Sequence, residues 1–196
     1  MKSGGFIFSS RKSSGIVFII LTLVVLTTIL FGRLYIRKVY PVKFKKHIIK
    51  YSEENGVDPY LVTSMIFVES KFYPKAVSKK GARGVMQIMP QTGEWVAEQI
   101  GIEDYHPDDL FDIETNIRLG TWYLAYLTRH FEGDLILVLA AYNSGQGSVR
   151  KWLKENQEPD NFNSFPFKET RAYVAKINCI YKIYKGLYNR FTFPQD

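Results

Sequence analysis

Residues 69–92 read ESKFYPKAVSKKGARGVMQIMPQT, and this stretch decides how the rest of the chain is interpreted. Its first residue, Glu69, follows the apolar run 65–68, whose composition is that of a buried helix. An acidic side chain on such a surface costs free energy unless it is paired, protonated or functional. Gly81 and Gly84 then interrupt a loop that leads into the compact block 84–90, GVMQIMP. Glu69 is therefore the residue whose presence most needs an explanation.

The charge of the chain is divided unevenly along its length. The 196 residues carry a net charge of +7, and the length fits one globular domain with an appendage. Residues 1–50 hold 10 of the 26 Lys and Arg and none of the 19 Asp and Glu, so the remainder holds 16 basic and 19 acidic residues. Nucleic-acid binding is not indicated, because the globular part lacks the basic excess that phosphate contacts require. The single cysteine, Cys179, allows no internal disulfide and is predicted to lie in the core.

Residues 15–32, GIVFIILTLVVLTTILFG, carry no charge and are flanked by Lys and Arg on both sides. As a helix these residues span roughly 27 Å, which is enough to cross the hydrocarbon core of a bilayer. We interpret them as an uncleaved transmembrane signal anchor within region 1–40, which also holds a short basic N-terminus and a basic linker. A cleaved signal peptide is the alternative, although no A-x-A-like processing site follows the run. A core helix would seldom be apolar on every face.

Region 41–196 is predicted to be a single all-α globular domain of many short helices. Asp58 followed by Pro59 indicates a capped helix start, and Asp134 is predicted to cap a later helix. Glu69 falls in the last turn of the helix that begins at Pro59, which is expected to bury one apolar stripe. Predicted helices cover residues 41–55, 59 to about 71–73, 90–95 with a stop near 101, 113–129, 135–142, 149–156 and 167–188. Residues 74–84, 108–112 and 157–166 are expected to be loops or turns.

Four motifs follow one another in the globular part. They are Glu69-Ser70, the block 84–90, AAYNSG at 140–145 and ETRAYV at 169–174. Each is modest alone, but the ordered set resembles the catalytic domain of the soluble lytic transglycosylase family over roughly residues 44–190. The resemblance implies a goose-type-lysozyme-like fold. It also implies cleavage of the β-1,4 bond between N-acetylmuramic acid and N-acetylglucosamine in peptidoglycan, which leaves a 1,6-anhydro end on the muramic acid.

The resemblance also implies which residues act. Glu69 would be the only catalytic acid, and Met86 would serve packing. The hydroxyl of Tyr173 is expected to hold either Glu69 or the N-acetyl group of the substrate. Candidate substrate-binding residues are Ser78, Gln87, Met89, Thr92, Tyr142, Asn143, Glu169 and Tyr173. The expected partners are peptidoglycan glycan strands and, through the N-terminal helix, a membrane; the sequence identifies no protein of the cell-wall machinery.

The chemistry of glycoside cleavage gives Glu69 independent support. Cleavage needs a proton donor at the leaving oxygen, and burial keeps a carboxyl protonated near neutral pH. Glycosidases that use water usually have a second carboxylate roughly 5–10 Å away. The nearest candidates for such a second acid, Glu94 and Glu98, are predicted to face solvent. A single acid instead suits attack by the sugar's own C6 hydroxyl, because the nucleophile is intramolecular.

Two other functions remain open from the residues alone. A muramidase would cleave the same bond with water, and a non-catalytic wall-binding or assembly module would keep the fold without the reaction. No cofactor is indicated. The three histidines are scattered without metal-ligand spacing: His47, His106 and His130.

The orientation of the predicted anchor is the one point on which charge and function disagree. Lys and Arg are more numerous after the apolar run than before it, which by the positive-inside rule places the globular domain in the cytoplasm. Peptidoglycan lies outside the membrane. We give the function precedence and expect a single-pass membrane protein with an extracytoplasmic catalytic domain.

Overall fold

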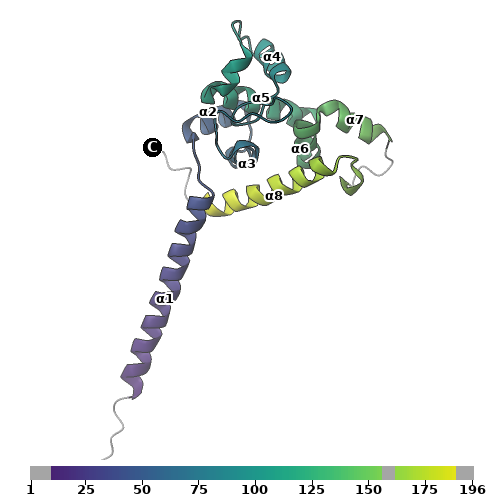
Figure 1. Cartoon of the computed structure of the whole chain (residues 1–196). Coiled ribbons are helices and arrows are strands. Elements are labelled where there is room, and N and C mark those ends of the chain that lie inside the picture. The colour runs from purple at the N-terminus through teal and green to yellow at the C-terminus, as the bar shows by residue number, and fades with distance from the viewer. Residues whose placement is uncertain (1–9, 156–161, 189–196) are drawn as a thin grey trace, which may run out of the picture. The chain divides into compact units, whose positions relative to one another are not determined.

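The structure is a computed structural model that describes residues 10–155 and 162–188. The chain forms two compact units, Met1–Pro41 and Val42–Asp196. The described residues contain α-helices and short 3-10 helices, and their only β-type pairing is two isolated bridges in the loop after α3 (Figure 1). The predicted all-α class is confirmed.

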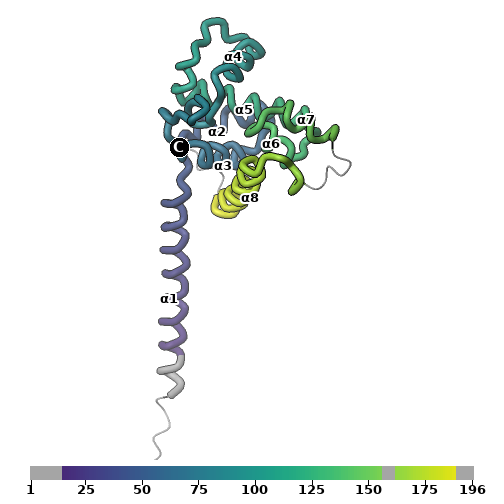
Figure 2. Tube along the Cα trace, turned by 45° about the vertical axis from the view of Figure 1, so that its right-hand side comes forward, coloured from purple at the N-terminus to yellow at the C-terminus, as the bar shows by residue number. Residues whose placement is uncertain are grey.

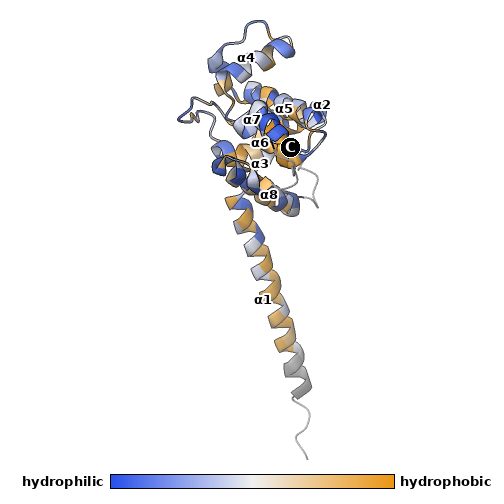
Figure 3. Ribbon diagram, turned by 90° about the vertical axis from the view of Figure 1, so that its right-hand side faces the viewer, coloured by the Kyte–Doolittle hydropathy of each residue, from blue (hydrophilic) through white to orange (hydrophobic). Residues whose placement is uncertain are grey.

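The first unit contains one helix, α1 (Ser10–Val39), which is longer than the predicted segment 15–32. Within the described residues, Gly15–Val39 is the one helix long and apolar enough to cross a membrane, with a mean hydropathy of 2.7. Apolar residues predominate along the coloured part of this helix, with hydrophilic ones near its C-terminal end (Figure 3). A signal sequence near an N-terminus has the same length and composition, so the helix by itself fits either assignment.

The second unit is built around α3. This helix packs against α2 and α8, and α8 also packs against α6. Figure 2 shows α3 between α2 and α8, with α4 at the opposite end of the unit from α8. The elements are α2 (Lys45–Asn55), α3 (Pro59–Ser70), α4 (Pro90–Gln99), η1 (Pro107–Phe111), α5 (Ile113–His130), α6 (Leu135–Ser144), α7 (Gln146–Glu155), η2 (Phe162–Ser164) and α8 (Lys168–Tyr188).

Helix α3 is buried on every side rather than along the single stripe that was predicted. All seven residues from Leu61 to Phe67 are buried. Two of them are polar, and their hydroxyls bond within the helix: Thr63 donates to the Pro59 carbonyl at 2.7 Å and Ser64 to that of Tyr60 at 2.6 Å. Such internal bonds let polar side chains enter a core without leaving a donor unpaired. The prediction of one stripe was wrong because neighbouring elements cover the helix on several sides.

The predicted helix caps are confirmed. The Asp58 carboxylate accepts a hydrogen bond from the Tyr60 amide at 2.8 Å. The Asp134 carboxylate accepts from the amides of Ile136 and Leu137 at 2.9 and 3.1 Å. Each bond satisfies backbone donors that the first turn of a helix cannot pair internally.

Several predicted boundaries differ from those observed. Helix α2 begins at Lys45 rather than at residue 41, because Phe44 before it adopts a left-handed φ of 57°. Helix α7 begins at Gln146, so the break after α6 is a single residue, Gly145, with φ 84°. The predicted turn 108–112 is mostly the 3-10 helix η1, and the predicted loop 157–166 contains η2; its residues 157–161 lie outside the described residues.

Cys179 is exposed, and its predicted place in the core was wrong. It lies on α8, and the spacing of the buried residues on that helix explains the error. The buried positions follow one helical face that omits position 179: Thr170, Tyr173, Val174, Ile177, Ile180 and Tyr184.

Candidate active site

The block 84–90 is fixed to α5 by one buried amide that the sequence interpretation missed. The side chain of Asn116 is fully buried and accepts a hydrogen bond from the Met86 amide at 2.7 Å. Its nitrogen donates to the carbonyls of Arg83 at 3.0 Å and Leu110 at 2.8 Å. The available signal was an amide among apolar residues on the inner face of a long amphipathic helix, where an unpaired polar group would be costly.

Two glycines allow this close approach. Gly84 has φ 77°, and a Cβ there would lie 2.0 Å from the Leu110 carbonyl oxygen and 2.2 Å from Asn116 Nδ2. On α5, a Cβ at Gly120 would lie 2.5 Å from the Met86 sulfur. Met86 is fully buried in the space that Gly120 leaves, which confirms its predicted packing role.

Two further hydroxyls bind the backbone of the same block. The Ser70 hydroxyl, at the end of α3, donates to the Val85 carbonyl at 2.8 Å. The Tyr142 hydroxyl, near the end of α6, donates to the Met86 carbonyl at 3.0 Å. Side chains from α3, α5 and α6 therefore meet at Val85 and Met86, and Tyr142 has a positioning contact besides any contact with substrate.

Gln87 follows with a left-handed φ of 50°, a conformation that costs energy for any residue other than glycine. Its side-chain nitrogen donates to the carbonyls of Ala76 at 3.1 Å and Gly84 at 2.9 Å. The two donors of the amide are used inside the loop, so its oxygen is the atom that can accept from a ligand.

Glu69 lies in the last turn of α3, as predicted, and lines a cavity. Burial raises the pKa of its carboxyl to about 7, although a hydrogen bond from Tyr173 and the positive charge of Lys176 both act to lower it. The Tyr173 hydroxyl donates to Glu69 Oε1 at 2.6 Å. Burial thus outweighs two effects that favour the charged form, so both the protonated and the charged form of the carboxyl are accessible near neutral pH.

The two phenols near Glu69 are hydrogen-bond donors over the whole physiological pH range. Burial, and then the charge of Glu69, raises the pKa values of Tyr142 and Tyr173 well above their usual range. Both hydroxyls therefore keep their protons while Glu69 titrates.

The candidate site is a pair of adjoining cavities of about 450 and 490 Å³. Glu69 and Ser78 line the second cavity, and Thr92 lines the first. Residues common to both come from the loop after α3, from α6 and from α8: Lys80, Gln87, Met89, Tyr142, Asn143 and Glu169. The structure therefore places seven of the eight predicted substrate-binding residues at one continuous opening. The eighth, Tyr173, is 8% exposed and reaches the site through Glu69.

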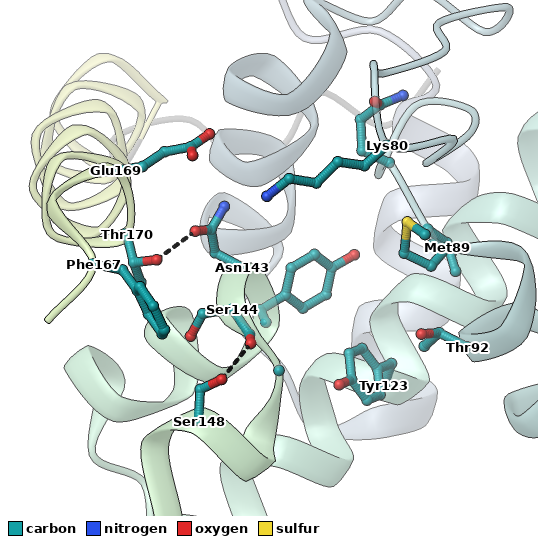
Figure 4. A pocket seen from close by; sticks show the side chains of 14 residues that line it. Lys80, Met89, Thr92, Tyr123, Asn143, Ser144, Ser148, Phe167, Glu169 and Thr170 are labelled. Atoms are coloured by element: carbon teal, nitrogen blue, oxygen red, sulfur yellow. Dashed lines mark hydrogen bonds between the residues drawn. The ribbon is translucent and has the colours of Figure 1, made fainter. Parts of the chain in front are cut away.

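The opening also contains a hydrogen bond and several lining side chains that were not predicted. Asn143 accepts a hydrogen bond from the Thr170 hydroxyl at 2.9 Å, which joins α6 to α8 (Figure 4). The aromatic rings of Tyr123 and Phe167 also line the first cavity. Lys80 extends across the opening toward Asn143, and Glu169 lies on the α8 side (Figure 4). Tyr123, Phe167 and Lys80 did not stand out in sequence, because they lie outside the four motifs.

The chemistry available here is that of a general acid. A carboxyl with a pKa of about 7 can give up a proton and take one back near neutral pH. In the described part of the chain, no three or more His, Cys, Asp or Glu side chains are grouped so that they could hold a metal ion.

Comparison with known proteins agrees with this geometry. Residues 46–165 match the family model of the transglycosylase SLT domain. The chain is 35% identical over 143 residues to the soluble lytic murein transglycosylase of Salmonella typhimurium, covering 70% of this chain and 22% of that protein. It is 30% identical over 174 residues to the membrane-bound lytic murein transglycosylase C of Sodalis glossinidius, covering 73% of this chain and 47% of that protein.

A solved structure shares the fold. The 70 kDa soluble lytic transglycosylase of Escherichia coli superposes with a TM-score of 0.73 at 32% identity, over 81% of this chain and 26% of that one. The chain thus spans about a quarter of the soluble relatives and about half of the membrane-bound one. The family match covers more than half of this chain, and it includes Glu69 and the block 84–90. The chain belongs to the transglycosylase SLT domain family.

Proposed function

We propose that the chain is a membrane-anchored lytic transglycosylase that cleaves the β-1,4 bond between N-acetylmuramic acid and N-acetylglucosamine in peptidoglycan. The family relationship supplies the class of reaction. One structural observation carries the proposal: Glu69 has a raised pKa, lines the cavity and is held by a phenol that stays protonated.

In the first step the protonated Glu69 gives its proton to the glycosidic oxygen, and the bond from that oxygen to C1 of the muramic acid breaks. The carbonyl oxygen of the substrate's own N-acetyl group forms a bond to C1 and takes up the developing positive charge. In the second step the C6 hydroxyl of the same sugar attacks C1, the N-acetyl oxygen leaves, and the Glu69 carboxylate accepts the hydroxyl proton. The 1,6-anhydro product forms, no water is consumed, and Glu69 is ready for another cycle.

The surroundings of Glu69 favour this route over hydrolysis. Hydrolysis with a water nucleophile usually needs a second carboxylate to activate the water. Apart from burial, which is the largest cause, the groups that shift the pKa of Glu69 are the Tyr173 phenol and Lys176, and neither is a carboxylate. Glu169 lines the same cavity but is exposed and belongs to α8. We assign Glu169 to substrate binding rather than to activation of water.

The remaining roles follow from which atoms are free to meet a sugar. The Gln87 oxygen can accept from a hydroxyl, because its nitrogen is already used. Asn143 is exposed, and its nitrogen can donate to an acetamido oxygen while its oxygen accepts from Thr170. The remaining candidate contacts line the opening with two hydroxyls, a thioether, a phenol and a carboxylate: Ser78, Thr92, Met89, Tyr142 and Glu169.

The apolar helix Gly15–Val39 is proposed as a single-pass anchor. Relatives that carry "membrane-bound" in their names support a membrane location for this family domain. We place the catalytic domain outside the cytoplasm, where peptidoglycan lies, against the orientation that the flanking Lys and Arg would favour.

The experiment is digestion of purified sacculi by the full-length chain in detergent, with mass spectrometry of the released fragments. Anhydro ends are expected. Products heavier by one water molecule, with reducing ends, would identify a muramidase instead. Binding to sacculi without any release would identify a wall-binding module. The Glu69→Gln variant is the matched control, because any cleavage that it retains comes from a contaminating enzyme or from another acid.

A further inference from the structure

Two adjacent lysines occupy the tip of a tight turn at the edge of the candidate site. The turn spans residues 78–82 and places Lys79 and Lys80 between Ser78 and Ala82. Lys80 lines both cavities, and Lys79 lines the one that contains Glu69. Both lysines are exposed. Their position beside the catalytic cavity distinguishes them from lysines elsewhere on the surface.

The turn itself is closed by hydrogen bonds at its base. The Ser78 amide donates to the Ala82 carbonyl at 2.9 Å, and the Ser78 hydroxyl accepts from the Ala82 amide at 3.0 Å. The Gly81 amide donates to the Ser78 carbonyl at 3.0 Å, and Gly81 has φ 88°. A short turn closed in this way fixes where its tip lies, so the two lysine stems start from defined positions.

In the part of the chain that the structure describes, the two ammonium groups have no partner. Within residues 10–155 and 162–188, no hydrogen bond or ion pair joins Lys79 or Lys80 to another group. Figure 4 shows the Lys80 side chain extended over the opening, with Glu169 across from it on α8. Among the residues that line the two cavities, Lys79 and Lys80 place positive charge on the loop side and Glu169 places negative charge on the α8 side.

A neutral glycan gives no reason for this charge. The N-acetylated sugars of a glycan strand are uncharged, and the negative groups of peptidoglycan are the carboxylates of the stem peptide attached to each muramic acid. We propose that Lys79 and Lys80 bind a carboxylate of that stem peptide and so direct the enzyme to peptide-bearing strands. The inference rests on the proposed function and adds the part of the substrate that the loop recognises. Glu169 repels the same carboxylate, which favours a stem that leaves the cavity on the loop side.

The test pairs a change in the enzyme with a change in the substrate. One enzyme carries Lys79→Gln and Lys80→Gln together, and one sample of sacculi has its stem carboxylates converted to amides with carbodiimide and ammonium chloride. On untreated sacculi the double variant is expected to lose about five- to tenfold in kcat/KM, as befits two partly exposed charge pairs. On amidated sacculi the wild type is expected to fall to the level of the variant, and the variant is expected to change little.

Lys182→Gln is the matched control. Lys182 is exposed on α8 and lines neither cavity, so this variant removes a positive charge without touching the turn. It is expected to respond to amidation as the wild type does. If it loses as much activity as the double variant, the effect is one of overall charge and the proposal is wrong.

Three further results would overturn the proposal. The double variant could match the wild type on both substrates, or it could lose the same factor on amidated sacculi. Its defect could also disappear on sacculi stripped of phosphodiester polymers with hydrofluoric acid, which would assign the lysines to a wall polymer's phosphates. In each case, anhydro products from the wild type would leave the proposed function standing. Failure of the proposed function is separate, because it appears as wild-type products without anhydro ends.

Discussion

The hydroxyl of Tyr173 donates a hydrogen bond to Glu69 Oε1 at 2.6 Å, across 104 positions of the chain. This bond stabilises the charged carboxylate, whereas burial stabilises the neutral acid, and burial is the larger effect. The balance leaves the pKa of Glu69 at about 7. A residue that must give a proton and then accept one benefits from a pKa close to the working pH, because neither form is then strongly disfavoured.

Replacing Glu69 by Gln is expected to remove activity and to stabilise the fold above neutral pH. Loss of a general acid commonly costs about 10²–10⁴-fold in rate. The stability effect follows from a folded pKa of about 7 against an ordinary 4.5. As pH rises, the folded state keeps the Glu69 proton to a higher pH than the unfolded state does. The contribution of this proton to the free energy of unfolding is therefore fully present below about pH 4.5 and is lost as pH rises through about 7.

Glutamine carries no charge to bury, so Glu69→Gln should be about 1–3 kcal/mol more stable than the wild type at pH 8 and nearly equal to it at pH 4. Urea unfolding at the two pH values measures the difference. Glu98→Gln, at an exposed position on α4, makes the same chemical change and should show neither effect. Equal stabilities of wild type and Glu69→Gln at pH 8 would mean that Glu69 is not buried as described.

The pH dependence of kcat/KM should report the same pKa. Activity is expected to fall as pH rises through about 7, because the first step needs protonated Glu69. Tyr173→Phe removes a group that lowers this pKa, so the falling limb should move to higher pH, and kcat should also fall because the carboxyl loses its orienting bond. Lys176→Gln should move the limb in the same direction without loss at the plateau. If the falling limb stays at the same pH in both variants, the pH profile of kcat/KM does not report the titration of Glu69.

The block 84–90 offers a test of close packing. Gly84→Ala places a methyl group 2.0 Å from the Leu110 carbonyl oxygen and is expected to destabilise the protein by about 3 kcal/mol or more. Gly101→Ala has a similar positive φ, 72° against 77°, but no atom within 4 Å of the added Cβ. It should cost about 1 kcal/mol, the price of the conformation alone. Similar unfolding midpoints for the two variants would contradict the described contact with α5.

Cys179 gives a test of both exposure and orientation. It is the only cysteine of the chain and is exposed on α8. A thiol reagent should therefore modify the folded protein without denaturant and without loss of activity, since Cys179 lines neither cavity. In intact cells with a permeable wall, a membrane-impermeant maleimide should label it if the catalytic domain lies outside. Labelling only after the membrane is opened would reverse the proposed topology.

The local elements of this fold were predictable because their signals lie in short stretches of sequence. Asp58 before Pro59, and Asp134 before an apolar run, each determine a helix start through bonds within three residues. The burial of α3 on all faces was not predictable, because it depends on α2 and α8, which pack against it from other parts of the chain. The prediction that Cys179 is buried failed for a related reason. Residue type predicts burial only on average, and Cys179 lies on the exposed face of α8.

Site residues that belong to a motif could be predicted from the sequence. Residues that shape the site through hydrogen bonds to the backbone could not. Glu69, Gln87 and Asn143 came from motifs, and the structure brings them to one opening. Asn116 belongs to no motif that was considered, yet two of its hydrogen bonds hold the loop and a third joins the same side chain to Leu110 of η1. The hydrogen bond from Tyr142 to the Met86 carbonyl, 56 positions away, likewise has no signal in the sequence.

The loop after α3 has two parts: a base that is bound to neighbouring helices, and a turn that carries Lys79 and Lys80 at the edge of the cavity. Its base, residues 83–86, is bound by side chains of α3, α5 and α6, whereas the turn 78–82 closes mainly on itself. Substitutions at positions 79 and 80 therefore carry little penalty for folding or for the surroundings of Glu69. Under the proposed function, substitutions at these two positions change which strands are bound and leave Glu69 untouched, so the turn is the place at which the chain could be adapted to walls of different chemistry.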